Sequence, residues 1–396
     1  MSTDLSTPVA PAPEPDPTPS GIAPERGTWA LSWHGVRTVA VLDLRQRVRS
    51  TRWMAALVVW FVVVGAVTWL TWVATDAAFG SSRDYGSTSS QVGPTIAGPA
   101  GPTVFGLIVF FVLFLGLLVS PTLSATAING DRNAGTLATL QVTLLTPAEI
   151  AVGKLGASWV AALAFLVVSV PFLILALTAG GTPVLSVVVC LLVLALLLAV
   201  VCAIGLGFSA LTARTSGSAV LTYVTVAGLS VISPMVFGLT VPAITTAEPV
   251  RVWNVPADFD WYAGEPPTCE LTTQSMTRTH TERTWWLLAV NPFVIVADAA
   301  PGARSGTSGS GFDVLGGIRE LVRDARTGPP TEINYCEGRF GTGGADSPVA
   351  QREPDRSVVW PWGLAVNLLL GAAGLATAVR RLTIPQRTLP RGTRVA

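Results

Sequence analysis

The stretch that decides the fold is NGDRNAGTLATLQVTLLTPAEIAVGK, residues 129–154. It separates two long apolar runs and carries the only charged residues between positions 103 and 213. Its first half contains Leu137, Leu140 and Leu144, whose spacing is typical of one face of a helix. We therefore expect a short surface helix there, then a break, then the start of a second helix.

The second helix has its own start signal. A threonine can cap a first helical turn, proline suits the first helical position, and a glutamate three residues after the cap completes a capping box. Thr146, Pro147 and Glu149 have this spacing. The sequence therefore predicts a capped helix that runs on into the next apolar stretch.

The loop resembles the cytoplasmic loop of ABC-2 type transporter permeases. The shared pattern is D-R-x-x-G-T-L-x-x-L followed by T-P-x-E-I-x-x-G-K, although the family often has glutamate where Asp131 stands. In that family, this loop carries a coupling helix that docks on the ATPase subunit. The predicted ATPase-coupling loop comprises Asp131, Arg132, Gly135, Thr136, Leu137, Leu140, Leu144, Thr146, Pro147, Glu149, Ile150, Gly153 and Lys154. A plain capped turn between two membrane helices remains the alternative.

The composition indicates an integral membrane protein. Half of the residues are hydrophobic and only 12% are charged, whereas soluble domains have about 25% charged residues. Apolar runs long enough to cross a bilayer occupy 53–74, 103–128, 155–179, 184–211, 217–241 and 357–379. The predicted fold class is an all-α integral membrane protein with about six transmembrane helices, five of them within residues 53–241.

The remaining segments set the expected orientation. Residues 1–28 are rich in proline and polar residues and are expected to be disordered. Residues 29–52 form an arginine-rich amphipathic pattern, typical of a helix lying among lipid headgroups. With the basic tail 380–396, they place both termini in the cytoplasm by the positive-inside rule. The protein is thus expected in the inner (cytoplasmic) membrane as a multi-pass protein.

The segment 242–356 is expected to be a large extracytoplasmic loop. Its apolar stretch 285–298 is too short to cross a membrane and is predicted to form a re-entrant or interfacial helix. Cys269 and Cys336 lie in this loop, so they form either a disulfide or two free thiols. Cys190 and Cys202 lie within a predicted span and are expected to be packing residues.

Several kinds of chemistry find no support in the sequence. There is no G-x-x-x-x-G-K-[ST] phosphate-binding motif, so ATP binding by this chain is not expected. His34 and His280 are expected on opposite sides of the membrane, so no metal site and no cofactor is predicted. The predicted spans lack Asp, Glu, Lys and Arg, which argues against an ion-driven carrier. The net charge of +1 gives no reason to expect a nucleic-acid partner.

The leading hypothesis is a permease subunit of an ABC-2 type exporter, not itself an enzyme. Its expected partners are a separate ABC ATPase subunit, a second permease subunit in a homo- or heterodimer, and membrane lipids. The apolar spans favour a hydrophobic or amphipathic substrate. The alternatives are a non-transporting membrane scaffold or sensor with an extracytoplasmic ligand-binding loop, and a membrane-embedded enzyme. A neighbouring gene for a P-loop ATPase would favour the first hypothesis.

Overall fold

The computed structural model describes residues 27–84, 101–135, 145–255, 259, 269–301, 313–335 and 357–383. Its elements in chain order are α1 (Trp33–Val48), α2 (Thr51–Asp84), α3 (Gly101–Ser124), α4 (Asn129–Asn133), α6 (Pro147–Thr178), α7 (Val184–Leu211), α8 (Thr215–Ala227), the π-helical turn η1 (Gly228–Ile232), α9 (Ser233–Thr240), the 3₁₀ turn η2 (Val241–Ile244), β1 (Thr245–Asn254), β2 (Glu270–Thr279), the 3₁₀ turn η3 (Thr281–Arg283), α10 (Trp286–Ala289), α11 (Pro292–Ala299), α12 (Val314–Thr327), β3 (Glu332–Asn334) and α13 (Trp360–Leu382).

Within these residues, 6 helical segments are long and apolar enough to cross a membrane. They are Thr51–Ala77, Gly101–Asn133, Pro147–Thr178, Val184–Leu211, Thr215–Ile244 and Trp360–Leu382. The predicted all-α multi-pass membrane fold is therefore confirmed. One expectation needs correction, because Glu149 and Lys154 belong to a spanning helix that begins at Pro147. The spans are thus not free of charged residues.

Helix α7 lies at the centre of the bundle, in contact with α3, α6 and α13. Its contact with α13 depends on small residues. A Cβ atom on Gly207 would lie 2.7 Å from the Cα of Gly374, and one on Gly374 would lie 2.6 Å from the carbonyl oxygen of Ala203. Small residues allow helix backbones in a membrane to approach closely. The α7–α13 pair is therefore a tight contact that larger side chains would separate.

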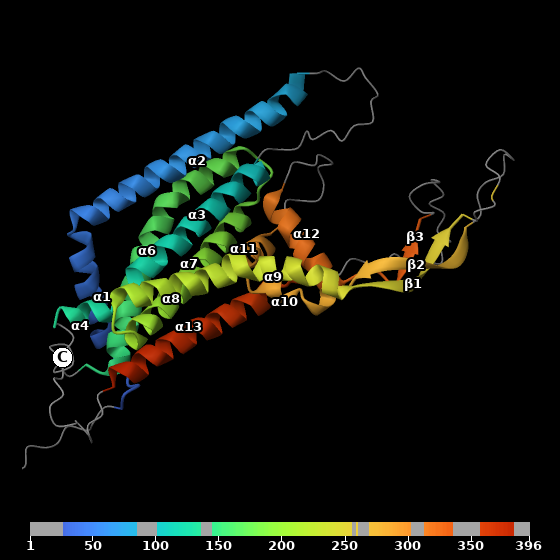
Figure 1. Cartoon of the computed structure of the whole chain (residues 1–396). Helices are drawn as coiled ribbons and strands as arrows, with labels where there is room; N and C mark the ends of the chain where they lie inside the picture. Colours follow the sequence, from blue (N-terminus) through green and yellow to red (C-terminus); the bar gives the residue numbers. More distant parts are fainter. Residues whose placement is uncertain are drawn as a thin grey trace, which may run out of the picture.

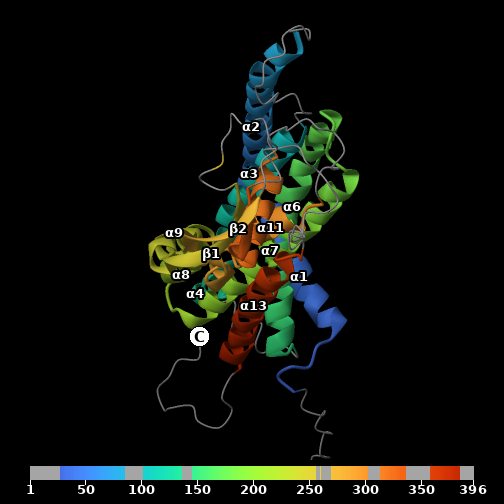
Figure 2. The ribbon, with the colours of Figure 1, turned by 90° about the vertical axis from the view of Figure 1, so that its right-hand side faces the viewer.

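Helices α2 and α8–α9 lie at the periphery of the bundle (Figures 1 and 2). In the 18-residue apolar stretch of each segment, only 17% of the α2 stretch and 11% of the α8–α9 stretch is buried within the chain. One side of α2 nevertheless packs on α6, where the indole Nε1 of Trp60 donates to Ser169 Oγ at 2.9 Å. The opposite sides of both segments present apolar side chains to the surroundings, as expected for helices in lipid.

The segment α8–α9 is interrupted by the π-helical turn η1. A side chain from another part of the chain bonds to a backbone carbonyl in this turn. Pro234 has no N–H group to donate to the carbonyl of Ser230, four residues earlier. The side-chain amide of Asn291 donates to this carbonyl instead, at 2.9 Å. Tyr223 also bonds across helices, because its hydroxyl donates to the Leu118 carbonyl at 2.8 Å. The break in α8–α9 is therefore held by residues far apart in the sequence.

The segment after α9 contains regular structure that the sequence analysis did not predict. Strands β1 and β2 pair antiparallel and β3 pairs parallel with β1, giving the order β2-β1-β3. The sheet and α12 lie at the end of the bundle opposite α1 and α4 (Figure 1). Within the apolar stretch 285–298, Asn291 caps α11 and Pro292 takes its first position, so two short helices form there.

A buried carboxylate joins three helices at this end. Asp298 on α11 has a fully buried side chain and pairs with Arg323 of α12 at 2.7 Å. Its other oxygen accepts the backbone N–H groups of Val359 and Trp360, at 2.6 and 2.7 Å. These groups open α13, whose own cap residue, Val359, offers no side-chain acceptor. Asp298 therefore caps a helix that begins 62 residues later in the chain.

The junction between β1, β2 and η3 is closed by a histidine between two glutamates. His280 Nδ1 lies 2.7 Å from Glu282 Oε1, and His280 Nε2 lies 2.9 Å from Glu248 Oε1. Hydrogen bonds to Glu282 and Glu248 raise the pKa of His280. Hydrogen bonds from Thr246 and His280 lower the pKa of Glu248, with a smaller contribution from Arg278. The cluster is most stable while the histidine is protonated and the glutamates are charged.

The pH dependence of this junction follows from these shifts. A raised histidine pKa stabilises the folded junction below the unfolded pKa of about 6.5, and this contribution is lost as pH rises through the folded pKa. We expect His280→Gln to speed hydrogen exchange at the Thr245–Thr279 pair relative to wild type at about pH 5.5, with little difference at about pH 9. His34→Gln is the matched control, because His34 lies in α1. A difference that persists unchanged at high pH would contradict the protonated clamp.

Candidate functional site

The predicted capping box is present at the start of α6. The Thr146 hydroxyl oxygen accepts the N–H of Glu149 at 3.2 Å, and Glu149 Oε2 accepts the N–H of Thr146 at 2.9 Å. Pro147 takes the first helical position. The local sequence therefore sets where α6 begins, because each of these groups satisfies a donor that the helix itself leaves unpaired.

Glu149 also caps a second helix, which the sequence analysis did not foresee. Its Oε1 accepts the N–H of Ser32 at 2.8 Å, and Ser32 is the N-cap residue of α1. The segment before α1 is tied to the same place, because the Thr146 hydroxyl donates to the Ala30 carbonyl at 2.6 Å and Ala148 N–H donates to Thr28 at 3.3 Å. With Glu149 only 1% exposed, one carboxylate fixes the starts of both helices.

Two glycines allow α1 to lie directly on α6. A Cβ atom on Gly153 would lie 2.7 Å from Val39 Cβ, and one on Gly35 would lie 2.8 Å from the Glu149 carboxylate. Either substitution would force the helices apart, since real Cβ atoms do not approach so closely. Gly153 belongs to the predicted coupling loop, and the structure gives it a packing role there.

Lys154 connects α1, α4 and α6 through ion pairs. Its ammonium contacts Asp131 of α4 and lies 3.5 Å from Asp43 of α1. Lys154 is 1% exposed, and the side chains of Asp43 and Asp131 are 14% and 29% exposed. Asp131 thus pairs with Lys154, at the far end of the quoted stretch. A buried ammonium needs such partners, because an unpaired one would carry a large desolvation penalty.

Arg47 ties α1 to the end of α3. Its Nη2 donates to the Leu123 carbonyl at 2.9 Å and lies 3.4 Å from Ser158 Oγ on α6. A cation at the last carbonyls of a helix is favourable, since those groups carry the negative end of the helix dipole. Burial lowers the pKa of Arg47, and the nearby Asp43 carboxylate opposes this effect. The α1 helix is therefore joined to both helices that flank the loop.

The start of α4 is fixed by α7. Ser209 Oγ accepts the backbone N–H groups of Ile128 and Asn129 at 3.0 and 3.1 Å. The Asn129 side-chain amide donates to Thr212 Oγ1 at 3.2 Å. These bonds satisfy the turn between α3 and α4 where neither helix can supply a partner. The residues on both sides of the segment 136–144 are therefore held by contacts with several helices. We call these contacts, made by Asn129, Asp131, Glu149 and Lys154, the α1–α4–α6 junction.

The structure describes only some of the other predicted site residues. Gly135 ends the described segment with a positive φ of 72°, a conformation that favours glycine. Thr136, Leu137, Leu140 and Leu144 lie outside the described residues, so the predicted helix face they form stays a prediction. Arg132 is half-buried on α4, and Ile150 is 2% exposed in the core of the junction.

The cysteines divide into two kinds. Cys190 and Cys202 are buried free thiols in α7, whereas Cys269 is disulfide-bonded. Cys336 lies outside the described residues, so its pairing with Cys269 stays a prediction. Within the part of the chain that the structure describes, no group of three or more His, Cys, Asp or Glu side chains is placed to hold a metal ion.

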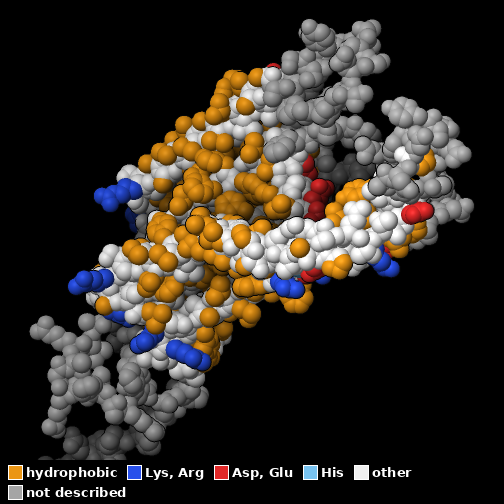
Figure 3. Space-filling view, turned by 45° about the vertical axis from the view of Figure 1, so that its right-hand side comes forward, with side chains coloured by type: hydrophobic (Ala, Val, Ile, Leu, Met, Phe, Trp, Pro, Cys, Tyr) orange, Lys and Arg blue, Asp and Glu red, His pale blue; other side chains and the backbone are white. Residues whose placement is uncertain are grey.

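The contacts at the α1–α4–α6 junction are suited to transmitting a movement from one of these helices to the others. Figure 3 shows an extended apolar surface along the bundle, with most of the arginine and lysine side chains in view at or near its α1–α4 end. Polar and ionic contacts at that end join α1, α4 and α6 into one unit. A load applied between α4 and α6 would therefore reach α3, α6 and α1 together.

A comparison with known families bears on this junction. A family described as "ABC-2 family transporter protein" matches residues 37–304, about two thirds of the chain. The matched range includes Asp43, Arg47, Asp131, Glu149 and Lys154. No curated protein matches the chain.

Proposed function

The chain belongs to the ABC-2 transporter family and is a permease of an ABC transporter, and we propose that it is driven by a separate ATPase subunit that docks on the segment 129–154. The observation that carries this proposal is the α1–α4–α6 junction. Glu149 caps α1 and α6, and Lys154 joins α1, α4 and α6. A partner that pushes on the segment between α4 and α6 would move these helices as one body.

In this proposal, the energy for transport comes from ATP hydrolysis by the partner subunit. No phosphate-binding G-x-x-x-x-G-K-[ST] motif is present, so ATP is bound and hydrolysed by the partner. The ATPase changes shape on binding and hydrolysing ATP, and the loop passes this movement to α3 and α6. Tilting these two helices changes which side of the membrane the translocation path opens to.

The orientation that this proposal requires places α1 and α4 in the cytoplasm. Arg380 and Arg381, at the end of α13, lie at the same end of the bundle as these helices (Figure 1). Arginines concentrated on one side mark that side as cytoplasmic. Both termini then lie on the cytoplasmic side of the inner membrane, and the sheet with α12 lies on the extracytoplasmic side.

A second permease subunit completes the transporter. The apolar sides of α2 and α8–α9, of which little is buried within one chain, are available to a partner subunit or to lipid. A path between two such surfaces suits hydrophobic or amphipathic molecules, which the transporter exports.

The test is a pull-down of candidate ABC ATPase subunits with the purified permease. Leu137, Leu140 and Leu144 would face the ATPase, so Leu140→Asp places a charge in an apolar contact. We expect binding to fall roughly 10- to 100-fold, as for a central interface residue, and transport to be lost with it. Thr139→Asp is the matched control, because it adds the same charge on the side of the predicted helix opposite the three leucines. Membrane insertion of both variants should equal wild type.

Two results would count against the proposal. Full ATPase binding by Leu140→Asp would mean that the loop is only a membrane turn, as would equal loss in both variants. Glu149→Gln is not a neutral control, although glutamine suits a capping box. Ser32 and Thr146 donate to different oxygens of the Glu149 carboxylate, so glutamine would place an NH2 donor against one of these two N–H groups.

A further inference from the structure

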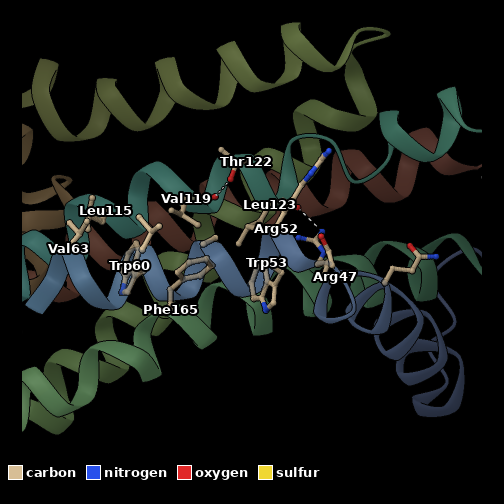
Figure 4. A pocket seen from close by; sticks show the side chains of 14 residues that line it. Arg47, Arg52, Trp53, Trp60, Val63, Leu115, Val119, Thr122, Leu123 and Phe165 are labelled. Carbon is tan, nitrogen blue, oxygen red and sulfur yellow. Dashed lines mark hydrogen bonds between the residues drawn. The ribbon is translucent and has the colours of Figure 1, made fainter.

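A groove of about 630 Å³ lies where α1 meets α2 (Figure 4). One wall is α2, the other is α3, and Phe165 of α6 contributes to the lining. Its lining is divided along its length. Arg47 and Arg52 lie at one end of the view, whereas Trp60, Val63 and Leu115 lie at the other. The groove is therefore polar at one end and apolar at the other.

The polar end is suited to an anion. Arg47 and Arg52 line it together with Gln46 and Ser50. Arg52 is exposed, and α2 begins at Thr51, so the positive end of the α2 dipole lies at the same place. The carboxylates nearest Arg47, those of Asp43 and Asp131, are held by Lys154. Guanidinium ions bind phosphate well, because their N–H groups can donate to two of its oxygens at once.

The apolar end is suited to a hydrocarbon chain. From Arg52 to Val63 the groove follows α2 for about 16 Å, at 1.5 Å per residue. The side chains along it include Trp53, Ala56 and Val59 on α2 and Val119 on α3. An inorganic anion would leave this length unfilled. A molecule with a phosphate head and a long apolar tail would cover both ends.

We propose that this groove binds one anionic phospholipid of the membrane, with the phosphate between Arg47 and Arg52 and an acyl chain along α2 and α3. The lipid fills the space beside the α1–α2 corner and links the arginine at the end of α1 to the first turn of α2. Because Arg47 also holds the end of α3, the bound lipid supports the α1–α4–α6 junction from the membrane side.

The experiment measures lipid retention by native mass spectrometry. Purified full-length protein in a non-ionic detergent is offered equal amounts of dioleoyl phosphatidylglycerol and dioleoyl phosphatidylcholine. Wild type should retain one phosphatidylglycerol in preference, and Arg52→Gln should weaken this retention about fivefold. Arg49→Gln is the matched control, because Arg49 lines a separate hollow on α1 with Arg37 and Arg45. Ala56→Phe, which fills the groove, should reduce retention of both lipids.

Four results would overturn the proposal. They are equal retention of the two lipids by wild type, an equal loss in Arg52→Gln and Arg49→Gln, wild-type retention by Ala56→Phe, and displacement of phosphatidylglycerol by inorganic phosphate. The same spectra show the number of chains in the particle. A dimer that is lost only in Ala56→Phe would show that a second copy of the chain, and not a lipid, fills the groove.

Discussion

Replacing Lys154 with methionine is expected to lower the free energy of unfolding by about 3 kcal/mol, the low end of the range for breaking a buried ion pair. Lys154 is 1% exposed and faces both Asp43 and Asp131. Methionine keeps most of the length and volume but removes the charge, so two carboxylates are left facing each other. Both retain some contact with water, which is why the effect stays at the low end. Equilibrium unfolding in mixed micelles with dodecyl sulfate measures it.

Neutralising the carboxylates at the same time separates charge from packing. The variant Lys154→Met with Asp43→Asn and Asp131→Asn should recover to within about 1 kcal/mol of wild type, because no unpaired charge remains buried. Lys154 is the only lysine in the sequence. An amine-reactive ester, read at the peptide that contains Lys154 so that the N-terminal amine is not counted, should modify Lys154 in the folded wild type far more slowly than in unfolded protein. Rapid labelling of the folded protein, or a triple variant as unstable as Lys154→Met, would contradict the buried triad.

The same substitution should also uncouple transport. In the proposed mechanism α1, α4 and α6 move as one body because Lys154 joins them. Without this link, ATPase binding at 129–154 should persist while substrate-stimulated ATP hydrolysis falls. This result would distinguish a loss of coupling from a loss of docking, which is the effect expected for Leu140→Asp.

The parts of the site that could be predicted are those whose signals are local in sequence. Thr146, Pro147 and Glu149 lie within four positions, and the capping box they predict is present. The spans were likewise predictable from uninterrupted apolar runs. The contacts that make the site a unit join distant residues, since Ser32 and Glu149 are 117 positions apart. No pattern in the sequence names such a partner, because a backbone N–H group looks the same at every position.

The small sheet and α12 were missed for a different reason. Strand β2 reads ELTTQSMTRT, which has few apolar residues and no clear alternation, so threonine-rich β-propensity was its only signal. Helix α12 reads VLGGIRELVRDART, in which two glycines weaken the helical propensity. Tertiary contacts compensate, since Leu315, Val322 and Ala325 are buried. Helix α12 forms because it packs on α11 and α3, whereas the strands are held by their pairing with one another.

Replacing Asp298 with alanine should be the most damaging change at the other end of the bundle, at roughly 3–5 kcal/mol of unfolding free energy. The Asp298 side chain is 0% exposed and holds Arg323 at 2.7 Å. It also accepts the N–H groups of Val359 and Trp360, the first of α13. Alanine would remove the carboxylate that Arg323 contacts and would leave two helix-start donors without their acceptor. The outer ends of α11, α12 and α13 would then separate, although every span keeps its sequence.

The matched control for Asp298→Ala is a substitution on α12. Asp324 is exposed on that helix, so Asp324→Ala removes the same group without an anchoring contact and should change stability by less than about 0.5 kcal/mol. Arg323→Ala combined with Asp298→Ala should cost less than the sum of the two single substitutions, because both remove the same ion pair. Asp298→Asn should lie between alanine and wild type, since one amide oxygen can still accept from Val359 and Trp360. If Asp298→Ala unfolds as wild type does in mixed micelles, α13 must be held by its packing on α7, α11 and α6 without this cap.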